Sequence, residues 1–266
     1  MRYVFKVGTS TLIREGGQPD LRTMDRLARV LSDIRGCGND VVLVSSGAIG
    51  VGTKKLGMPK RPTELRYKQA AAAVGQCELM HLYDKLFSEY GQTVAQILLT
   101  DEDVESEAGR ENLVRTFDAL LELGVIPVVN ENDSVSSAEI ETGHTKMLGD
   151  NDSLSAIVAG FCDADRLVIL TDIDGLYDGD PKQPTSRRIP LVTEITDDMF
   201  TFVGGSGTSW GTGGMITKLN AARFAMARGI DTYIISGSNM DGIYDIIDGK
   251  EIGTRFSSGG KQHDGT

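Results

Sequence analysis

Short apolar runs that alternate with amphipathic segments are the feature of this sequence that most restricts its fold. Six runs rich in Val, Ile and Leu have the length of buried strands, and each is bounded by polar residues or glycine. They cover residues 3–7, 41–44, 94–99, 126–129, 167–170 and 232–235. Between them, apolar side chains recur at helical spacing over residues 21–34, 65–87, 112–123, 153–161 and 219–228. This alternation predicts an α/β fold with a mainly parallel sheet and helices on both faces.

Residues at the ends of these helices indicate where each begins and stops. Asp20 precedes the first helical pattern and is expected to be its N-cap. Gly36, Gly124, Gly160 and Gly229 fall near C-terminal ends, where glycine often takes the left-handed conformation that closes a helix.

Composition narrows the class of protein. The 266 residues suffice for one large domain or two small ones, and neither an internal repeat nor a proline-rich linker divides them, so we expect one α/β domain. The net charge of −11 argues against a nucleic acid partner, because phosphates need a basic surface. No apolar run approaches the roughly 18 residues of a spanning helix, so we expect no membrane association.

The cysteines and histidines argue against a disulfide framework and a metal site. Cys37, Cys77 and Cys162 are odd in number and far apart, which is typical of a reducing compartment and favours a cytoplasmic location. The three histidines are equally scattered, which disfavours a His/Cys metal site.

Polar and glycine-rich loops follow several of the predicted strands. Ligands of open parallel sheets bind beyond the carboxyl ends of the strands, so these loops are where a site is expected. They are KVGTST (6–11), SSGAIGVG (45–52), NENDS (130–134) and TDIDGLY (171–177), together with GDND (149–152) and WGTGGMITK (210–218), which each precede a helix.

Each loop has a structural interpretation beside the functional one. Lys6 could reach solvent from the end of its strand or contact a phosphate across the Gly8 turn. The stretch 45–52 could be an ordinary turn or an opening that lets a ligand approach the backbone. NENDS could be an ordinary turn, since Asn and Asp favour turns, or Asn130, Asn132 and Asp133 could bind the ammonium and carboxylate of an amino acid.

The glycine-rich stretch 210–218 does not match either common phosphate-binding motif. A P-loop requires glycine before the lysine and Ser or Thr after it, whereas Lys218 lies between Thr217 and Leu219. The dinucleotide pattern G-x-G-x-x-G is absent from the chain.

Two acidic segments are also open to more than one interpretation. GDND resembles a helix cap, but Asp152 could also hold two lysines beside an anion if Lys6 and Lys218 converge in space. The run DGLYDGDP (174–181) lacks the ligand order of an EF-hand, so a solvated turn is favoured over a metal loop.

Taken in order, KVGTST, SSGAIGVG, VVNENDSV, GDNDSLSA, LTDIDGLY and GTGGMITK resemble the amino acid kinase family, and within it the glutamate 5-kinases. The resemblance extends from Lys6 to about Phe256. It implies an αβα sandwich around a mainly parallel open sheet of about eight strands. It also implies transfer of the ATP γ-phosphate to the side-chain carboxylate of L-glutamate, the first step of proline biosynthesis.

The resemblance assigns roles residue by residue. Lys6 and Lys218 are similar to the lysines that contact the transferring phosphoryl group, and Asp152 to the aspartate that orients them. The implied glutamate site comprises Ser46, Gly47, Ala48, Asp133 and Asn151. The implied nucleotide site comprises Lys6, Thr171, Asp172, Thr212, Gly213, Gly214, Met215 and Lys218.

The implied chemistry suits these residues. A glutamate side chain has a reference pKa of about 4.3 and is already ionised at neutral pH, so the reaction needs no general base. The obstacle is the approach of an anion to a polyanion, which lysines and Mg²⁺ bound with ATP would relieve.

Beyond the kinase domain (1–256), we expect a flexible tail (257–266) and no C-terminal PUA domain, which many bacterial members carry. The segment 141–148 is longer than the usual family pattern and is expected to be a loop over the glutamate site. The resemblance also suggests a homo-oligomer, a dimer or tetramer, and feedback inhibition by proline. The alternatives are a kinase of the same fold acting on another acid, and a non-catalytic amino-acid sensor.

Overall fold

All six predicted runs form strands, and two shorter strands complete the sheet. The computed structural model describes residues 1–135, 148–203 and 214–259. Its strands are Arg2–Val7 (β1), Asp40–Val44 (β2), Val94–Leu99 (β3), Ile126–Glu131 (β4), Arg166–Thr171 (β5), Leu191–Val192 (β6), Asp231–Ser236 (β7) and Thr254–Phe256 (β8). β6 and β8 have only two and three residues, too few for a recognisable apolar run. The expected sheet of about eight strands is therefore confirmed.

The strand order explains where a ligand can enter. The sheet has the order β3-β4-β2-β1-β5-β7-β8-β6, and it is parallel except that β8 runs antiparallel to β7. Strands β2, β3 and β4 lie on one side of β1, and strands β5 to β8 lie on the other. The strand order therefore reverses between β1 and β5. Loops that leave adjacent strands in opposite directions create a crevice at the carboxyl ends, where ligands of such sheets bind.

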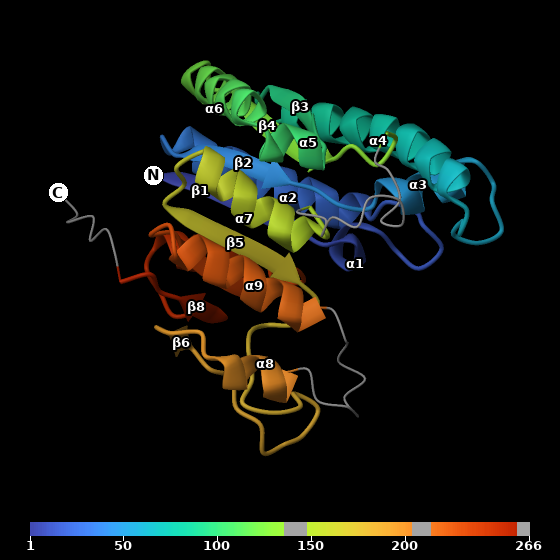
Figure 1. The fold of residues 1–266 in the computed structure, drawn as a ribbon. Helices are drawn as coiled ribbons and strands as arrows, with labels where there is room; N and C mark the ends of the chain where they lie inside the picture. The colour runs from blue at the N-terminus through green and yellow to red at the C-terminus, as the bar shows by residue number, and fades with distance from the viewer. Residues whose placement is uncertain (136–147, 204–213, 260–266) are drawn as a thin grey trace.

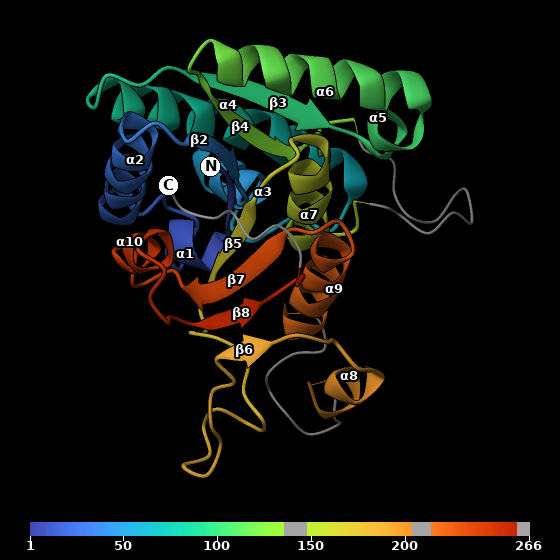
Figure 2. The same ribbon diagram turned by 90° about the vertical axis from the view of Figure 1, so that its left-hand side faces the viewer.

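Helices cover both faces of the sheet (Figure 1). They are Thr9–Leu12 (α1), Leu21–Gly36 (α2), Ala48–Lys55 (α3), Leu65–Ser88 (α4), Asp101–Glu105 (α5), Glu107–Glu122 (α6), Asn151–Phe161 (α7), Asp197–Val203 (α8), Gly214–Met226 (α9) and Gly242–Ile247 (α10). Figure 2 shows α2 and α10 on one side of the sheet and α7 and α9 on the other. The five predicted helical segments are confirmed within a few residues.

Alternating side chains of the strands supply two separate cores. On β1, Tyr3, Phe5 and Val7 belong to the core beneath α2, α3 and α4, whereas Val4 belongs to the core beneath α6, α7 and α9. Because every second side chain of a strand points to the same face, Lys6 lies on the same face as Val4, which α7 and α9 cover.

The predicted helix ends are correct in part. The Asp20 side chain accepts from the Thr23 amide and caps α2, as expected. Gly124 and Gly229 have φ of +76° and +75°, which is the predicted left-handed conformation. For Gly36 and Gly160 the prediction is wrong, because both lie inside their helices. The left-handed residues there are Gly38 and Asp163, each two positions after the last residue of its helix.

Some expectations concern residues outside the described ranges. The predicted loop 141–148 falls there except for Leu148, as do Thr212, Gly213 and most of the predicted tail. Among the helices of the described residues, none combines the length and apolar character needed to cross a membrane.

Candidate active site

A polar pocket opens at the carboxyl edge of the sheet, where the strand order reverses. Its volume is about 270 Å³. Its lining comes from the ends of β1, β2 and β4, from the first turns of α1, α3 and α7, and from the loop between α3 and α4. The lining residues are Lys6, Thr9, Ser46, Gly47, Ala48, Ile49, Gly50, Arg61, Asn130, Glu131, Asp133, Asp150, Asn151 and Asp152. The structure thus brings together all five residues of the predicted glutamate site with Lys6 and Asp152.

Two buried lysines converge on one aspartate at this pocket. The Lys6 ammonium lies 2.6 Å from Asp152 Oδ1, and that of Lys218 lies 3.1 Å from Asp152 Oδ2. Lys6 and Lys218 are each 7% exposed and Asp152 is 4% exposed. The convergence required by the sequence hypothesis is therefore present, and Lys6 does not reach solvent from its strand end.

Asp152 is held in its ionised form. Burial is the largest single effect and raises its pKa, but the nearby charges of Lys6 and Lys218 together with hydrogen bonds outweigh it. Hydrogen bonds from Lys6 and from Thr217, at 2.7 Å from Oδ2, act in the same direction. The net result is a pKa below the ordinary value of an aspartate, so Asp152 is ionised at neutral pH.

The N-terminus of α7 is already occupied by a side chain. The Asp150 carboxylate accepts from the amides of Asp152 and Ser153 at 2.8 and 2.9 Å. Capping is therefore what Asp150 does here. Because Asp150 takes these two amides, they are not available to an anion in this arrangement.

The N-terminus of α3 offers amides to the pocket instead. Its N-cap is Gly47, which has φ of +99° and no side chain to accept from the first turn. A Cβ at Gly47 would lie 2.9 Å from Ile13 Cγ1, so the position requires glycine for its conformation and its space. The first amides of a helix lack intrahelical partners, and here they follow a residue that cannot cap them. The opening predicted around 45–52 is thus a helix N-terminus that lines the pocket.

Asn151 forms one wall of the pocket together with Ser46. Its Nδ2 donates to the Ser46 hydroxyl at 2.7 Å and to the Ser45 carbonyl at 2.9 Å. These bonds join the first turn of α7 to the end of β2. Ser46 is buried, and its hydroxyl hydrogen remains available to a ligand because it accepts from Asn151.

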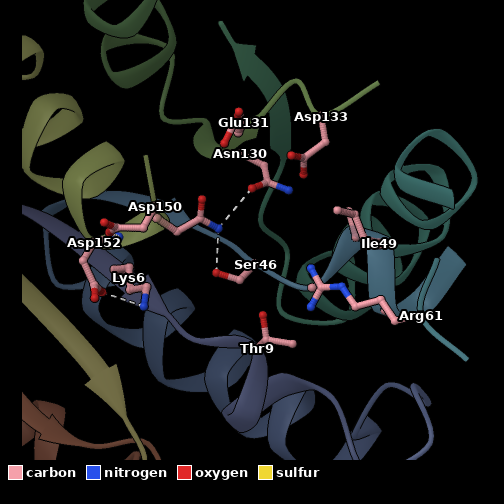
Figure 3. Close-up of a pocket in the computed structure, with 14 residues that line it drawn as sticks. Lys6, Thr9, Ser46, Ile49, Arg61, Asn130, Glu131, Asp133, Asp150 and Asp152 are labelled. Atoms are coloured by element: carbon pink, nitrogen blue, oxygen red, sulfur yellow. Dashed lines mark hydrogen bonds and ion pairs between the residues drawn. The ribbon is translucent and has the colours of Figure 1, made fainter. Parts of the chain in front are cut away.

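Each end of the pocket carries a cationic and an acidic side chain (Figure 3). Figure 3 shows Lys6 and Asp152 at one end and Arg61 and Asp133 toward the other. Arg61 is exposed, and among the described residues it forms no ion pair with a carboxylate. Sequence reasoning missed Arg61, because the arginine lies in the loop between α3 and α4 rather than at a strand end.

Of the predicted nucleotide residues that the structure describes, Lys6 lines this pocket, whereas Thr171, Asp172, Gly214, Met215 and Lys218 do not. Thr171 ends β5, next to β1, and its hydroxyl donates to Asp172 Oδ1 at 3.0 Å. Gly214 and Met215 begin α9, four and three residues before Lys218. Thr212 and Gly213 lie outside the described residues.

The acidic run 174–181 behaves as a turn. Asp174 accepts from Tyr177 at 2.9 Å and pairs with Arg188 at 3.3 Å. Within the part of the chain that the structure describes, no group of three or more His, Cys, Asp or Glu side chains could hold a metal ion.

The sequence matches a known family over most of its length. Residues 1–236 match the sequence model of the amino acid kinase family. A protein named glutamate 5-kinase from Clostridium perfringens is 52% identical over 96% of this chain and 94% of its own length. Proteins with the same name from Listeria monocytogenes and Enterococcus faecalis are 49% and 45% identical, over 100% and 99% of this chain and 96% and 97% of their lengths.

Solved structures share the architecture at low sequence identity. A carbamate kinase from Giardia lamblia bound to AMP-PNP has a TM-score of 0.68 at 17% identity and covers 96% of this chain and 98% of its own. The T. acidophilum isopentenyl phosphate kinase product complex has a TM-score of 0.65 at 18% identity, with 96% and 100% coverage. These two structures support the fold alone.

Proposed function

The chain belongs to the amino acid kinase family, and from that premise we propose that it transfers the γ-phosphoryl group of ATP to the side-chain carboxylate of L-glutamate. The product is L-glutamyl 5-phosphate, and the reaction is the first step of proline biosynthesis. Relatives that are 45–52% identical over nearly the whole chain bear the name of this activity.

The order of charges along the pocket is the observation that carries the choice of glutamate. Free glutamate has a carboxylate at one end and an ammonium with a second carboxylate at the other. Lys6 lies at one end of the pocket, and Arg61 and Asp133 lie toward the other (Figure 3). We assign the side-chain carboxylate to the Lys6 end, the α-carboxylate to Arg61 and the ammonium to Asp133. An acetylated amino group would lose the charge that Asp133 attracts.

Electrostatic stabilisation is the main task of the chain's own residues. The acceptor carboxylate is ionised at neutral pH, so no side chain has to remove a proton. The ammonium groups of Lys6 and Lys218 contact the transferring phosphoryl group and offset the charge that builds up there. Asp152 forms ion pairs with both ammonium groups, at 2.6 and 3.1 Å, and so acts as a positioning residue. The first amides of α3 and the Ser46 hydroxyl hold the substrate in line.

We place ATP beside the C-terminal end of β5 and the N-terminal end of α9, with Thr171, Asp172 and the stretch Thr212–Lys218 as its contacts. Support comes from their shared sheet edge and from Lys218, which reaches the Asp152 cluster from this side. Mg²⁺ bound to the ATP phosphates would lower their negative charge, as in other kinases.

Two further properties are proposed on the same basis. Proline carries the α-carboxylate and ammonium of glutamate without its side-chain carboxylate, so it should compete at the Arg61 and Asp133 end and inhibit. We also expect a homo-oligomer, a dimer or tetramer, which light scattering at micromolar concentration would detect.

A panel of acceptors tests the proposed function. ADP release is measured with purified protein, ATP, Mg²⁺ and either L-glutamate, L-aspartate or N-acetyl-L-glutamate. The assignment predicts that glutamate has the highest kcat/KM of the three. A higher kcat/KM for either competitor would support a kinase but refute glutamate as its preferred substrate. No turnover with any of the three acids would favour a non-catalytic sensor.

A further inference from the structure

The buried Gln76 side chain ends a line of amide groups that leads to the pocket. Gln76 Oε1 accepts from Asn130 Nδ2 at 3.0 Å, and Asn130 Oδ1 accepts from Asn151 Nδ2 at 3.2 Å. Asn151 Nδ2 also donates to the Ser46 hydroxyl. Gln76 is 8% exposed and Asn130 is 2% exposed, so solvent is a poor substitute for these partners.

The direction of these hydrogen bonds is fixed at the pocket end by an atom that can only accept. Asn151 Nδ2 faces the Ser45 backbone carbonyl at 2.9 Å, so the amide nitrogen must point into the wall. Since that nitrogen also faces Asn130, the Asn130 oxygen must point toward Asn151. Its nitrogen then points away and donates to Gln76 Oε1 on α4.

The same direction decides what the pocket presents to a ligand. Because the Asn151 nitrogen donates to the wall of the pocket, the side-chain oxygen of Asn151 points the other way. There it can accept a hydrogen bond from an ammonium group. Ser46 accepts from Asn151 and therefore keeps its own hydrogen for a carboxylate oxygen. Reversal of the amides would exchange donors and acceptors at both positions.

We propose that Gln76 is a positioning residue for the amino acid substrate, which through Asn130 fixes the Asn151 amide with its oxygen toward the pocket. Gln76 does not line the glutamate pocket itself but faces an adjacent one, so its effect passes through Asn130 and Asn151. The proposal rests on the proposed function, because it takes L-glutamate as the ligand of the oriented groups.

Substitutions that keep or remove the acceptor test this role. Gln76→Leu has a similar volume and cannot accept, whereas Gln76→Glu keeps an acceptor oxygen. Gln92→Leu is the matched control, since Gln92 follows α4 and no contact links its side chain to these amides. KM for glutamate, KM for ATP and kcat are measured for each variant, with thermal unfolding as the check on folding.

The expected result separates positioning from general damage. Gln76→Leu should raise KM for glutamate about 5- to 30-fold, the equivalent of one or two lost hydrogen bonds, with KM for ATP changed less than about twofold. Gln76→Glu should recover most of the loss, and Gln92→Leu should match the wild type. If Gln76→Leu does not fold, Gln76→Ala takes its place with the same expectation.

Two results would overturn the proposal. An unchanged KM for glutamate in a folded Gln76→Leu or Gln76→Ala protein, with an active wild type, would refute the positioning role and leave the proposed function intact. Equal losses in Gln76→Leu and Gln76→Glu would show that the acceptor is not what matters. A wild type inactive with glutamate would instead refute the proposed function and the inference together.

Discussion

The cluster around Asp152 illustrates how single residues determine the site. A lysine buried in the end of a strand is unfavourable unless a charge compensates it, and Asp152 compensates Lys6 and Lys218 at once. Two ammonium groups held this way can contact a phosphoryl group without moving. The sequence placed Lys6 at a strand end and Asp152 and Lys218 in the first turns of helices, and the family resemblance assigned their roles.

Replacement of Lys218 by alanine should leave the fold intact and remove most of the activity. Loss of one charge-stabilising donor typically raises the barrier by about 3–4 kcal/mol, so kcat should fall by about 10²- to 10³-fold. Steady-state kinetics measure this, with exposed Lys54→Ala as the control. A Lys218→Ala protein with wild-type kcat would contradict the role given to this lysine.

Replacement of Asp152 by asparagine should destabilise the protein as well as slow it. The variant leaves two buried ammonium groups without their carboxylate, and such losses typically cost about 3–5 kcal/mol. Urea unfolding at pH 7 measures the difference in free energy of unfolding. A difference below about 1 kcal/mol would mean that the pairing contributes little to stability.

The pH dependence of that difference follows from the lowered pKa of Asp152. A carboxyl group whose folded pKa lies below its unfolded value stabilises the fold above the unfolded pKa, and this stability disappears as the pH falls through the folded pKa. The difference in free energy of unfolding between wild type and Asp152→Asn should therefore be largest at neutral pH. It should decrease once the pH falls below 3.8, the ordinary pKa of an aspartate. A difference in free energy of unfolding that increases on acidification would contradict a lowered pKa for Asp152.

At the scale of elements, two helices meet backbone to backbone beside the pocket. A Cβ at Gly75 of α4 would lie 1.8 Å from the Ala48 carbonyl oxygen, and one at Gly52 of α3 would lie 1.7 Å from the Ala71 carbonyl oxygen. Because Ala48 lines the pocket, this contact transmits the position of α4 to the first turn of α3.

Gly75→Ala should therefore destabilise the protein and weaken substrate binding together. The added methyl group must separate α3 from α4, which we expect to cost about 1–3 kcal/mol or more and to raise KM for glutamate. Gly36→Ala is the matched control, because Gly36 lies within α2 and has open space around a Cβ, so this change should be neutral or slightly stabilising. Equal unfolding midpoints for the two variants would refute the importance of the contact.

Sequence patterns predicted long elements and missed short ones for physical reasons. Parallel strands buried on both faces leave continuous apolar runs, which is why β1 to β5 and β7 were visible. The helix α3 was missed because its sequence, AIGVGTKK, has two glycines and reads as a loop. It packs against α4, with close backbone contacts at Gly52 and Gly75, and Arg61 lines the pocket from the loop between these helices. Neither fact is local in sequence.

On the scale of the whole molecule, the two cores on opposite faces of the sheet make some side chains inaccessible. Cys162 is buried at the end of α7, and burial raises the pKa of its thiol to about 12, whereas Cys37 and Cys77 are exposed. Under native conditions at pH 8, a thiol reagent should modify two cysteines quickly and the third only in denaturant. Mass spectrometry of the labelled protein measures this, and rapid native labelling of Cys162 would contradict the packing of α7.

The most direct test of the central claim is to trap the phosphorylated product. Purified protein is incubated with ATP, Mg²⁺, L-glutamate and hydroxylamine, which converts an acyl phosphate into a stable hydroxamate. The account predicts the hydroxamate of the glutamate side chain, formed in equal amount to ADP and lost in Lys218→Ala. ADP released without any hydroxamate, or a hydroxamate at the α-carboxylate, would contradict phosphoryl transfer to the side-chain carboxylate.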